Sequence, residues 1–197
     1  MSTISTETIK ELRDATGLSI MQCKKALEEA NGDISKATII LQKKGASVAA
    51  KKADRTMAAG NIAAYTHTTG NVAALVELMC ETDFVAKNDE FKALAYNIAM
   101  QVAATNPKFL KMEDISEAAK TEAREVFDKE LAGKPEEMKA KIMEGKINSF
   151  FKDRVLMEQE YIKNPEVTVR GLIEGYVQKF GERIEVGRFV RFGIGEK

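Results

Sequence analysis

The chain has 197 residues, 44% of them hydrophobic, which is long enough and apolar enough to bury a sizeable core. Its 30 Lys and Arg residues balance its 30 Asp and Glu residues, whereas a non-specific nucleic-acid binder usually carries a basic excess, so direct nucleic-acid binding is not expected. No run approaches the roughly 20 apolar residues that span a bilayer, and Met1–Ser5 has no secretory-signal character, so we expect a cytoplasmic protein without membrane contact.

Residues 1–45 are predicted to form a module of three short helices. Gly17 ends the first helix as a glycine C-cap does. Ser19 begins the second helix, and Gln22 three residues later completes a capping box. Asp33 caps the third helix. A bundle of this size is marginal alone but reasonable as a module of a larger protein.

Residues 46–60, which follow Gly45, are rich in alanine and lysine and are predicted to be a basic, helix-prone linker. Positive charges gather in this segment or just before it, at Lys43, Lys44, Lys51, Lys52 and Arg55. They form either a solvated surface or a phosphate site for RNA, and the balanced net charge favours the solvated surface.

Residues 61–197 are predicted to form an α+β domain. Asn61–Thr69 and Val72–Cys80 form a hairpin around Gly70 and Asn71, and Ile184–Phe192 adds a third strand. Helices are predicted from Asn88 or Asp89 to Thr105, over Ser116–Leu131 and Glu136–Tyr161 with a break at Gly133–Pro135, and from Thr168 to Phe180. The expected architecture is a three-helix bundle, then a small antiparallel three-stranded sheet covered by helices, with a helical segment over about residues 108–163.

The inventory of reactive side chains argues against an enzyme. His67 is the only histidine, and it lies in a predicted strand, where it is either catalytic or a surface imidazole. Cys23 and Cys80 lack metal-ligand spacing and are typical of small buried hydrophobes. There is no phosphate-binding loop or dinucleotide fingerprint. We therefore expect no catalytic residue, metal or cofactor.

Apolar residues occupy the connection between the first two helices. Leu18, Ile20 and Met21 cannot all point into a core as small as that of residues 1–45. Two interpretations stay open: ordinary packing in the bundle, or an exposed apolar cluster that binds a protein.

A second unusual feature is the segment Thr82–Ala86, predicted as a turn between a buried strand and the start of a helix. It carries a large aromatic side chain, Phe84, although loops usually run over the surface. Asp83 could cap the turn while Phe84 folds back into the core, or the segment could present Phe84 to a partner.

Blocks of sequence along nearly the whole chain resemble the bacterial elongation factor Ts family, in its short form. The blocks are Ile9–Gly17, Met21–Leu27, Asn31–Asp33, Glu81–Asn88, Ile98–Ala104, Lys141–Lys146 and Arg188–Phe192. The first and fourth are the most specific.

The resemblance implies a nucleotide-exchange factor, without covalent chemistry, that binds elongation factor Tu. Its ubiquitin-associated-like three-helix module would touch the GTPase domain through Arg13, Ile20 and Met21, with Leu18 in the same cluster. Its second contact would be the turn formed by Thr82, Asp83, Phe84 and Val85. The Phe would wedge between helices near the magnesium and phosphate end of the nucleotide site, and the helices after residue 104 would reach other domains of the partner.

The resemblance also bears on assembly. Short members of the family pair as homodimers, and a three-stranded sheet with a free edge has reason to do so. Whether Cys80 forms an intermolecular disulfide is left open, and Glu160 stands where the family usually has proline. The alternative function is a ubiquitin-associated-like adaptor that binds peptides and has no exchange activity.

Overall fold

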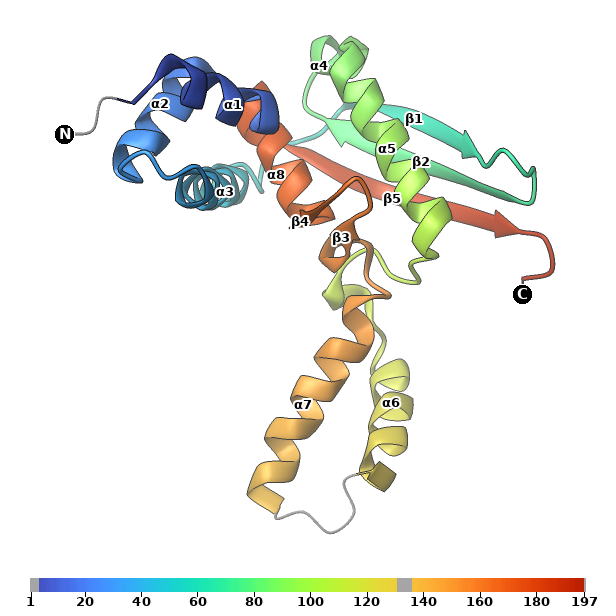
Figure 1. The fold of residues 1–197 in the computed structure, drawn as a ribbon. Coiled ribbons are helices and arrows are strands. Elements are labelled where there is room, and N and C mark those ends of the chain that lie inside the picture. Colours follow the sequence, from blue (N-terminus) through green and yellow to red (C-terminus); the bar gives the residue numbers. More distant parts are fainter. Residues whose placement is uncertain (1–3, 131–135, 197) are drawn as a thin grey trace. The chain divides into compact units, whose positions relative to one another are not determined.

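The computed structural model describes residues 4–130 and 136–196 (Figure 1). The predicted break at Gly133–Pro135 lies outside these residues. The elements in chain order are α1 (Thr6–Thr16), α2 (Ile20–Glu29), α3 (Ile34–Ala50), β1 (Ala59–Thr66), β2 (Val72–Cys80), α4 (Asp83–Lys87), α5 (Asp89–Thr105), η1 (Met112–Asp114), α6 (Glu117–Glu130), α7 (Glu136–Lys152), η2 (Leu156–Glu158), β3 (Glu160–Tyr161), β4 (Asn164–Thr168), α8 (Val169–Phe180) and β5 (Ile184–Gly193).

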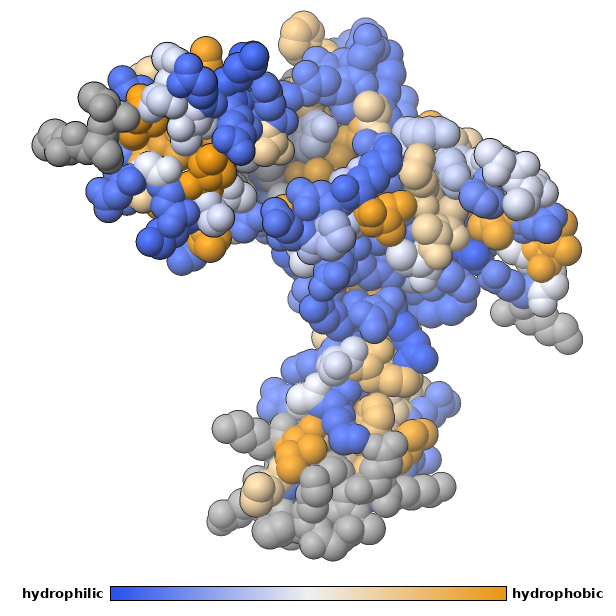
Figure 2. Space-filling view, in the orientation of Figure 1, coloured by the Kyte–Doolittle hydropathy of each residue, from blue (hydrophilic) through white to orange (hydrophobic). Residues whose placement is uncertain are grey.

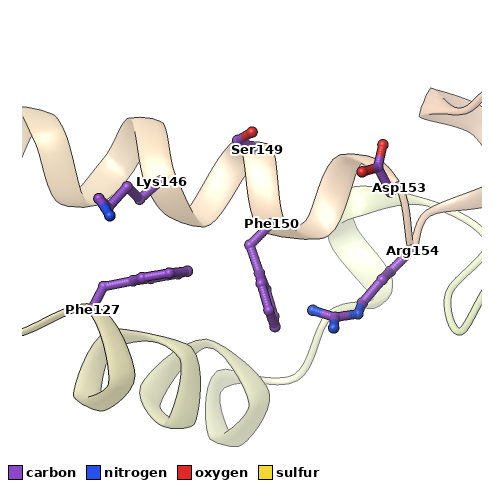
Figure 3. Close-up of a pocket in the computed structure, with 6 residues that line it drawn as sticks. All are labelled: Phe127, Lys146, Ser149, Phe150, Asp153 and Arg154. Carbon is purple, nitrogen blue, oxygen red and sulfur yellow. The ribbon is translucent and has the colours of Figure 1, made fainter. Parts of the chain in front are cut away.

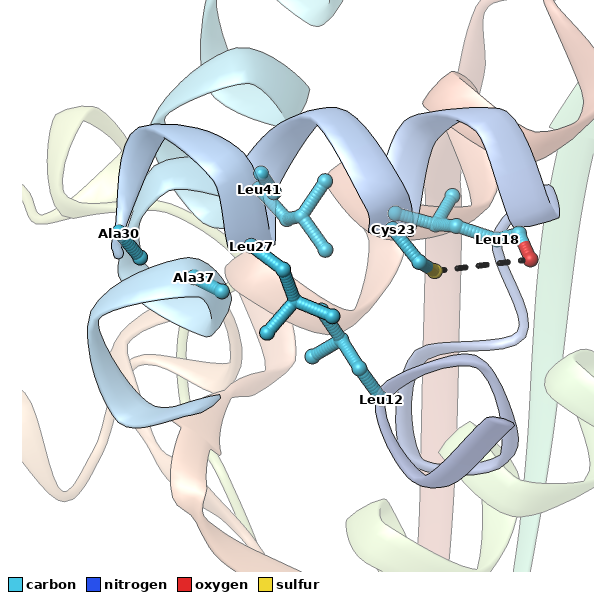
Figure 4. Packing of buried hydrophobic residues seen from close by; sticks show 8 residues of the cluster. Leu12, Leu18, Cys23, Leu27, Ala30, Ala37 and Leu41 are labelled. Atoms are coloured by element: carbon cyan, nitrogen blue, oxygen red, sulfur yellow. Dashed lines mark hydrogen bonds between the residues drawn. The ribbon is translucent and has the colours of Figure 1, made fainter. Parts of the chain in front are cut away.

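The three N-terminal helices begin and end where their caps predict. Gly17 adopts the left-handed conformation, with a φ of 68°, and its N–H donates to the carbonyl of Arg13. Ser19 and Gln22 form the reciprocal capping box, and the Asp33 carboxylate accepts from the backbone N–H of the third residue after it. The bundle closes on a small apolar core, most of which is labelled in Figure 4: Leu12, Leu18, Cys23, Ala26, Leu27, Ala30, Ala37 and Leu41.

The third helix is longer than predicted. It does not stop at Gly45 but continues to Ala50, through the first third of the segment expected to be a linker. Gly45 is buried, and a Cβ at this position would lie 3.3 Å from the backbone carbonyl oxygen of Glu174 in α8. The glycine thus permits a close approach of the two helices, and alanines favour helix beyond it.

The sheet has the strand order β1-β2-β5, and the α+β prediction is confirmed (Figure 1). In the predicted hairpin, the N–H of His67 donates to the carbonyl of Val72 at 2.8 Å. One sheet face packs on α5: Tyr65 and Tyr96 meet edge to face at 5.7 Å between ring centroids. On the same side, Nε of Arg191 donates to the carbonyl of Ala103 at 2.9 Å.

The long second helix of the helical segment ends earlier than predicted, at Lys152 rather than Tyr161. Beyond it, the carbonyl of Arg154 accepts from the N–H groups of Lys108 and Phe109 at 2.8 and 3.1 Å, so the chain leaves the helix to pair with a distant segment. Residues 160–161 then form β3, which pairs antiparallel with β4 in a two-stranded sheet that the sequence did not indicate. The proline position noted for Glu160 therefore lies in a strand.

Contacts divide the chain into two compact units. Unit 1 comprises Met1–Ala63, Glu77–Ala95 and Arg170–Gly187, and unit 2 comprises Ala64–Val76, Tyr96–Val169 and Arg188–Lys197. The predicted domain boundaries near residues 45 and 60 stay predictions. Within the described ranges, no helix combines the length and apolar character needed to cross a bilayer.

Candidate functional site

The segment predicted as a turn after β2 is a one-turn helix, α4, between the strand and α5. Thr82 is its N-cap: the backbone is extended, and the hydroxyl accepts from the N–H of Val85 at 3.4 Å. At the other end, the N–H of Asn88 donates to the carbonyl of Val85 at 3.0 Å. The segment predicted as a turn is instead helical, because the Thr82 cap and five residues without glycine or proline suffice to close one helical turn.

The short helix directs two adjacent apolar side chains to different surroundings, one to solvent and one to the core. Val85 is 4% exposed and packs inward, whereas Phe84 is 81% exposed. The question left open by the sequence is therefore resolved for Phe84, which does not fold back into the core. Consecutive helical positions point about 100° apart, so the Val85 side chain does not lie on the surface that presents Phe84, and its assignment to the partner-binding surface stays a prediction.

Charged and polar groups flank the exposed ring. Thr82 and Asp83 are exposed, and the Asp83 carboxylate accepts from Nζ of Lys87 at 2.6 Å, one turn along α4. The hydrogen bond from Lys87, and then its charge, hold the pKa of Asp83 below its ordinary value. At neutral pH, Phe84 is thus presented beside an exposed ion pair.

Two carboxylates far apart in sequence hold the N-terminal end of α4. The carboxylate of Glu182 accepts from the backbone N–H of Thr82 at 3.0 Å and from its hydroxyl at 2.6 Å. In return, the carboxylate of Glu81 accepts from the backbone N–H of Arg183 at 2.6 Å and lies 3.2 Å from the Arg55 guanidinium. Sequence reasoning missed these residues, since about 100 positions separate the partners.

Cys80 lies beneath this network. Its thiol is buried and donates to the carbonyl of Thr82 at 3.2 Å. Burial, and secondly the neighbouring Glu182 carboxylate, raises the pKa of Cys80 to about 11. Disulfide exchange requires a thiolate, so both burial and protonation oppose an intermolecular disulfide at this position.

The second candidate cluster lies on the N-terminal module. Ile20 and Met21, in the first turn of α2, are 56% and 62% exposed, and Arg13 on α1 is also exposed. Leu18 is only 4% exposed and belongs to the core of the bundle, so it does not lie on the surface with Ile20 and Met21, and its assignment to the partner-binding cluster stays a prediction. Figure 2 shows hydrophobic patches open to solvent among hydrophilic residues on this module.

The sequence-predicted residues thus form two groups on different elements of unit 1. Phe84, Thr82 and Asp83 share α4 and its cap, whereas Arg13, Ile20 and Met21 belong to α1 and α2. No hydrogen bond or ring contact joins the two groups within the described residues. Each presents exposed apolar surface, which is the property that a protein-binding site requires.

A pocket of about 450 Å³ lies elsewhere, between α6 and α7 (Figure 3). Phe127 and Phe150 meet edge to face in it at 5.6 Å between ring centroids. The Arg154 guanidinium lies 3.6 Å from the ring centroid of Phe150, and Nζ of Lys146 lies 5.2 Å from that of Phe127. The two cationic side chains of the pocket thus already lie against its aromatic rings. None of the predicted site residues lines the pocket.

Other chemistry finds little support in the geometry. His67 is exposed, and its Nδ1 lies 3.0 Å from the Tyr65 hydroxyl, an arrangement that fits the surface interpretation. Across residues 4–130 and 136–196, no three or more His, Cys, Asp or Glu side chains are grouped as metal ligands would be.

Comparison with known proteins identifies the family of the chain. The family model described as "Elongation factor TS" matches residues 3–196. The chain belongs to the elongation factor Ts family. It is 47% identical over 195 residues to elongation factor Ts of Carboxydothermus hydrogenoformans, covering 98% of this chain and 90% of that protein. Elongation factor Ts of Thermotoga sp. (strain RQ2) is 49% identical over 193 residues, with 98% and 97% covered. That of Thermosipho melanesiensis is 48% identical, with 98% and 100% covered.

Proposed function

We propose that this elongation factor Ts chain acts as a nucleotide-exchange factor: it binds elongation factor Tu with GDP bound and promotes GDP release. The observation that carries the proposal is the exposure of Phe84, 81% on a helix whose two ends are fixed. Burying one Phe side chain contributes about 1.5–3 kcal/mol, so a ring held in water is available for a partner to bury. Phe84 would insert near the magnesium and phosphate end of the nucleotide site.

The energy of one aromatic ring is too small for the whole task. A thousandfold acceleration of GDP release requires about 4 kcal/mol of differential stabilisation. Phe84 alone is marginal against that value, and in this proposal Arg13, Ile20 and Met21 form an anchoring contact that holds the ring in place. Only contacts that are better with the nucleotide-free partner promote exchange.

The alternative, a ubiquitin-associated-like adaptor that binds peptides, would use only Ile20 and Met21 on the N-terminal module. It gives no role to Phe84, whose exposure is greater than that of either residue. Exchange accounts for both groups and needs no covalent step, catalytic side chain or cofactor. We place this activity in the cytoplasm, where translation occurs, with no role for direct nucleic-acid binding.

We further propose that the chain forms a homodimer through the sheet face opposite α5. In β2, Leu75 alternates with the buried Ala74 and Val76 and is 43% exposed. In β5, Arg191 reaches α5, so its neighbours Val190 and Phe192 point to the other face, where they are 40% and 67% exposed. We call Leu75, Val190 and Phe192 the open sheet face. A second copy would cover it.

Release of a fluorescent GDP analogue from elongation factor Tu tests the exchange proposal. The preloaded GTPase is mixed with excess unlabelled GDP, with and without this chain, and the fluorescence decay is recorded. The proposal predicts a rate that rises with chain concentration and then saturates. An unchanged decay at all concentrations contradicts it. If the chain binds the GTPase without changing the decay, the adaptor function is favoured.

A further inference from the structure

The position of Glu182 follows from the end of α8. The helix stops at Phe180, and Gly181 adopts the left-handed conformation with a φ of 71°, its N–H donating to the carbonyl of Val177 at 2.9 Å. The next residue is Glu182. Nζ of Lys52 donates to the carbonyl of Gly181 at 2.6 Å and further restrains this bend.

The carboxylate that emerges from this bend meets the cap of α4. It takes both donors of Thr82, the backbone N–H and the hydroxyl, one on each carboxylate oxygen. The Thr82 hydroxyl is also the acceptor for the N–H of Val85. Glu182 therefore orients the group that caps the helix, and charge-assisted hydrogen bonds of this kind are stronger than neutral ones.

A second hydrogen bond joins the same two segments, with donor and acceptor exchanged between them. Glu81 accepts the backbone N–H of Arg183, so each of two adjacent residues after β2 pairs with one of two adjacent residues after α8. Nη1 of Arg183 also donates to the carbonyl of Arg55 at 2.6 Å. This crossed pair fixes both the position and the direction of the chain as it enters α4.

A helix of five residues cannot hold its own shape. Nucleation of a helix is unfavourable, and one isolated turn does not repay it. The orientation of Phe84 therefore depends on the tertiary contacts at α4: Val85 buried on the inner side, and Glu182 bound to the cap. The 81% exposed ring of Phe84 adds little packing to hold the helix in place.

We propose that Glu182 is a positioning residue for GDP release: by binding both donors of Thr82, it fixes α4 so that Phe84 is presented in one orientation. This inference rests on the proposed exchange function. A preorganised ring enters the partner without the cost of ordering a mobile turn at that moment. Glu182 itself need not touch elongation factor Tu.

The test uses the full chain and the release of fluorescent GDP from elongation factor Tu, measured up to saturation. Glu182→Ala should lower the maximal release rate about tenfold, with little change in the half-saturating concentration, because the contact on α1 and α2 remains. Glu182→Gln keeps one acceptor oxygen and should recover part of the rate. Glu90→Ala is the matched control, since it removes a glutamate that pairs with Lys179 across two helices of the same unit.

A variant cycle distinguishes positioning from general loss of structure. In a Phe84→Ala background, Glu182→Ala should cause no further loss of maximal rate, because Glu182 acts through the ring. Equal losses in both backgrounds would overturn the inference, as would wild-type rates in Glu182→Ala alone. If the wild-type chain itself fails to accelerate release, the exchange proposal falls first, and this role falls with it.

Amide hydrogen exchange at α4 tests the positioning role without the partner protein. In Glu182→Ala, the amide hydrogens of residues 82–86 should exchange with solvent about tenfold faster, while the urea midpoint of the chain changes little. Unchanged exchange at these amides would contradict the positioning role even if the release rate fell.

Discussion

Glu81 illustrates how single residues make the junction at α4 sensitive to acid. The backbone N–H of Arg183, and then the Arg55 guanidinium, hold the pKa of its carboxyl below the ordinary value. The folded state therefore binds fewer protons than the unfolded state near this pKa. The stabilisation that the ionised Glu81 carboxylate contributes is complete above its pKa in the unfolded state, about 4.3. It is lost as the pH falls through its lower pKa in the folded state.

We predict that Glu81→Gln flattens the acid limb of the stability profile. Urea unfolding of wild type and variant should give unfolding free energies whose difference shrinks between about pH 5 and pH 3, since only the wild type loses this carboxylate. Glu11→Gln, at an exposed glutamate on α1, serves as the control. Parallel profiles for wild type and Glu81→Gln would contradict the assignment.

At the scale of single residues, the sequence located segments with exposed apolar side chains but did not decide the direction of each side chain. Phe84, Ile20 and Met21 are exposed, as a binding role requires, but Leu18 and Val85 are buried. The reason is periodicity: a cluster of adjacent apolar residues on a helix or before it faces several directions, and only the fold decides which of them meets the core. Glu182 carries no local signal, because its partner is 100 positions away.

Among the elements, the first turn of α2 is proposed as the anchor. We predict that the double variant Ile20→Ala, Met21→Ala raises the half-saturating concentration for GDP release at least tenfold, because two exposed apolar side chains lose their burial against the partner. The maximal rate should change much less. Ile39→Ala on α3, with a side chain 50% exposed, is the matched control.

Stability should not explain that result. Both side chains are more than half exposed in the free chain, so the double variant should unfold at nearly the wild-type urea concentration. A variant that retains the wild-type half-saturating concentration would show that α2 is not the anchor.

The ends of helices and strands were predictable where residues close in sequence determine them. Gly17, Ser19 and Asp33 mark helix boundaries through their own backbone or side chain, and the structure confirms them. The end of α7 was not predictable, because the Arg154 carbonyl is taken by a segment some 45 residues earlier in the chain. The pair β3 and β4 was missed for a similar reason: β3 has only two residues, too few for any alternation.

At the scale of the whole molecule, the open sheet face predicts assembly. Light scattering should give twice the mass of one chain, and Phe192→Asp should give a monomer, because a buried unpaired carboxylate is costly. Val126→Asp, at a side chain on α6 that is 59% exposed, should leave the dimer intact. A monomeric wild type, or a dimer that tolerates Phe192→Asp, would contradict the proposed interface.

Nucleotide exchange also requires that GDP and this chain weaken each other's binding to elongation factor Tu. If this chain weakens GDP binding, then GDP must weaken the binding of this chain by the same factor. Phe84 is the side chain to which the account assigns this coupling, while α2 supplies binding that is shared by both states. The two contacts should therefore separate in a saturation experiment.

The most direct measurement is the maximal rate of fluorescent GDP release from elongation factor Tu at saturating Phe84→Ala. Loss of about 1.5–3 kcal/mol of ring burial predicts a maximal rate about 10- to 150-fold below wild type. Binding to the GTPase should persist through the module that carries Ile20 and Met21. A Phe84→Ala chain that drives release at the wild-type maximal rate would contradict the central role of the exposed ring.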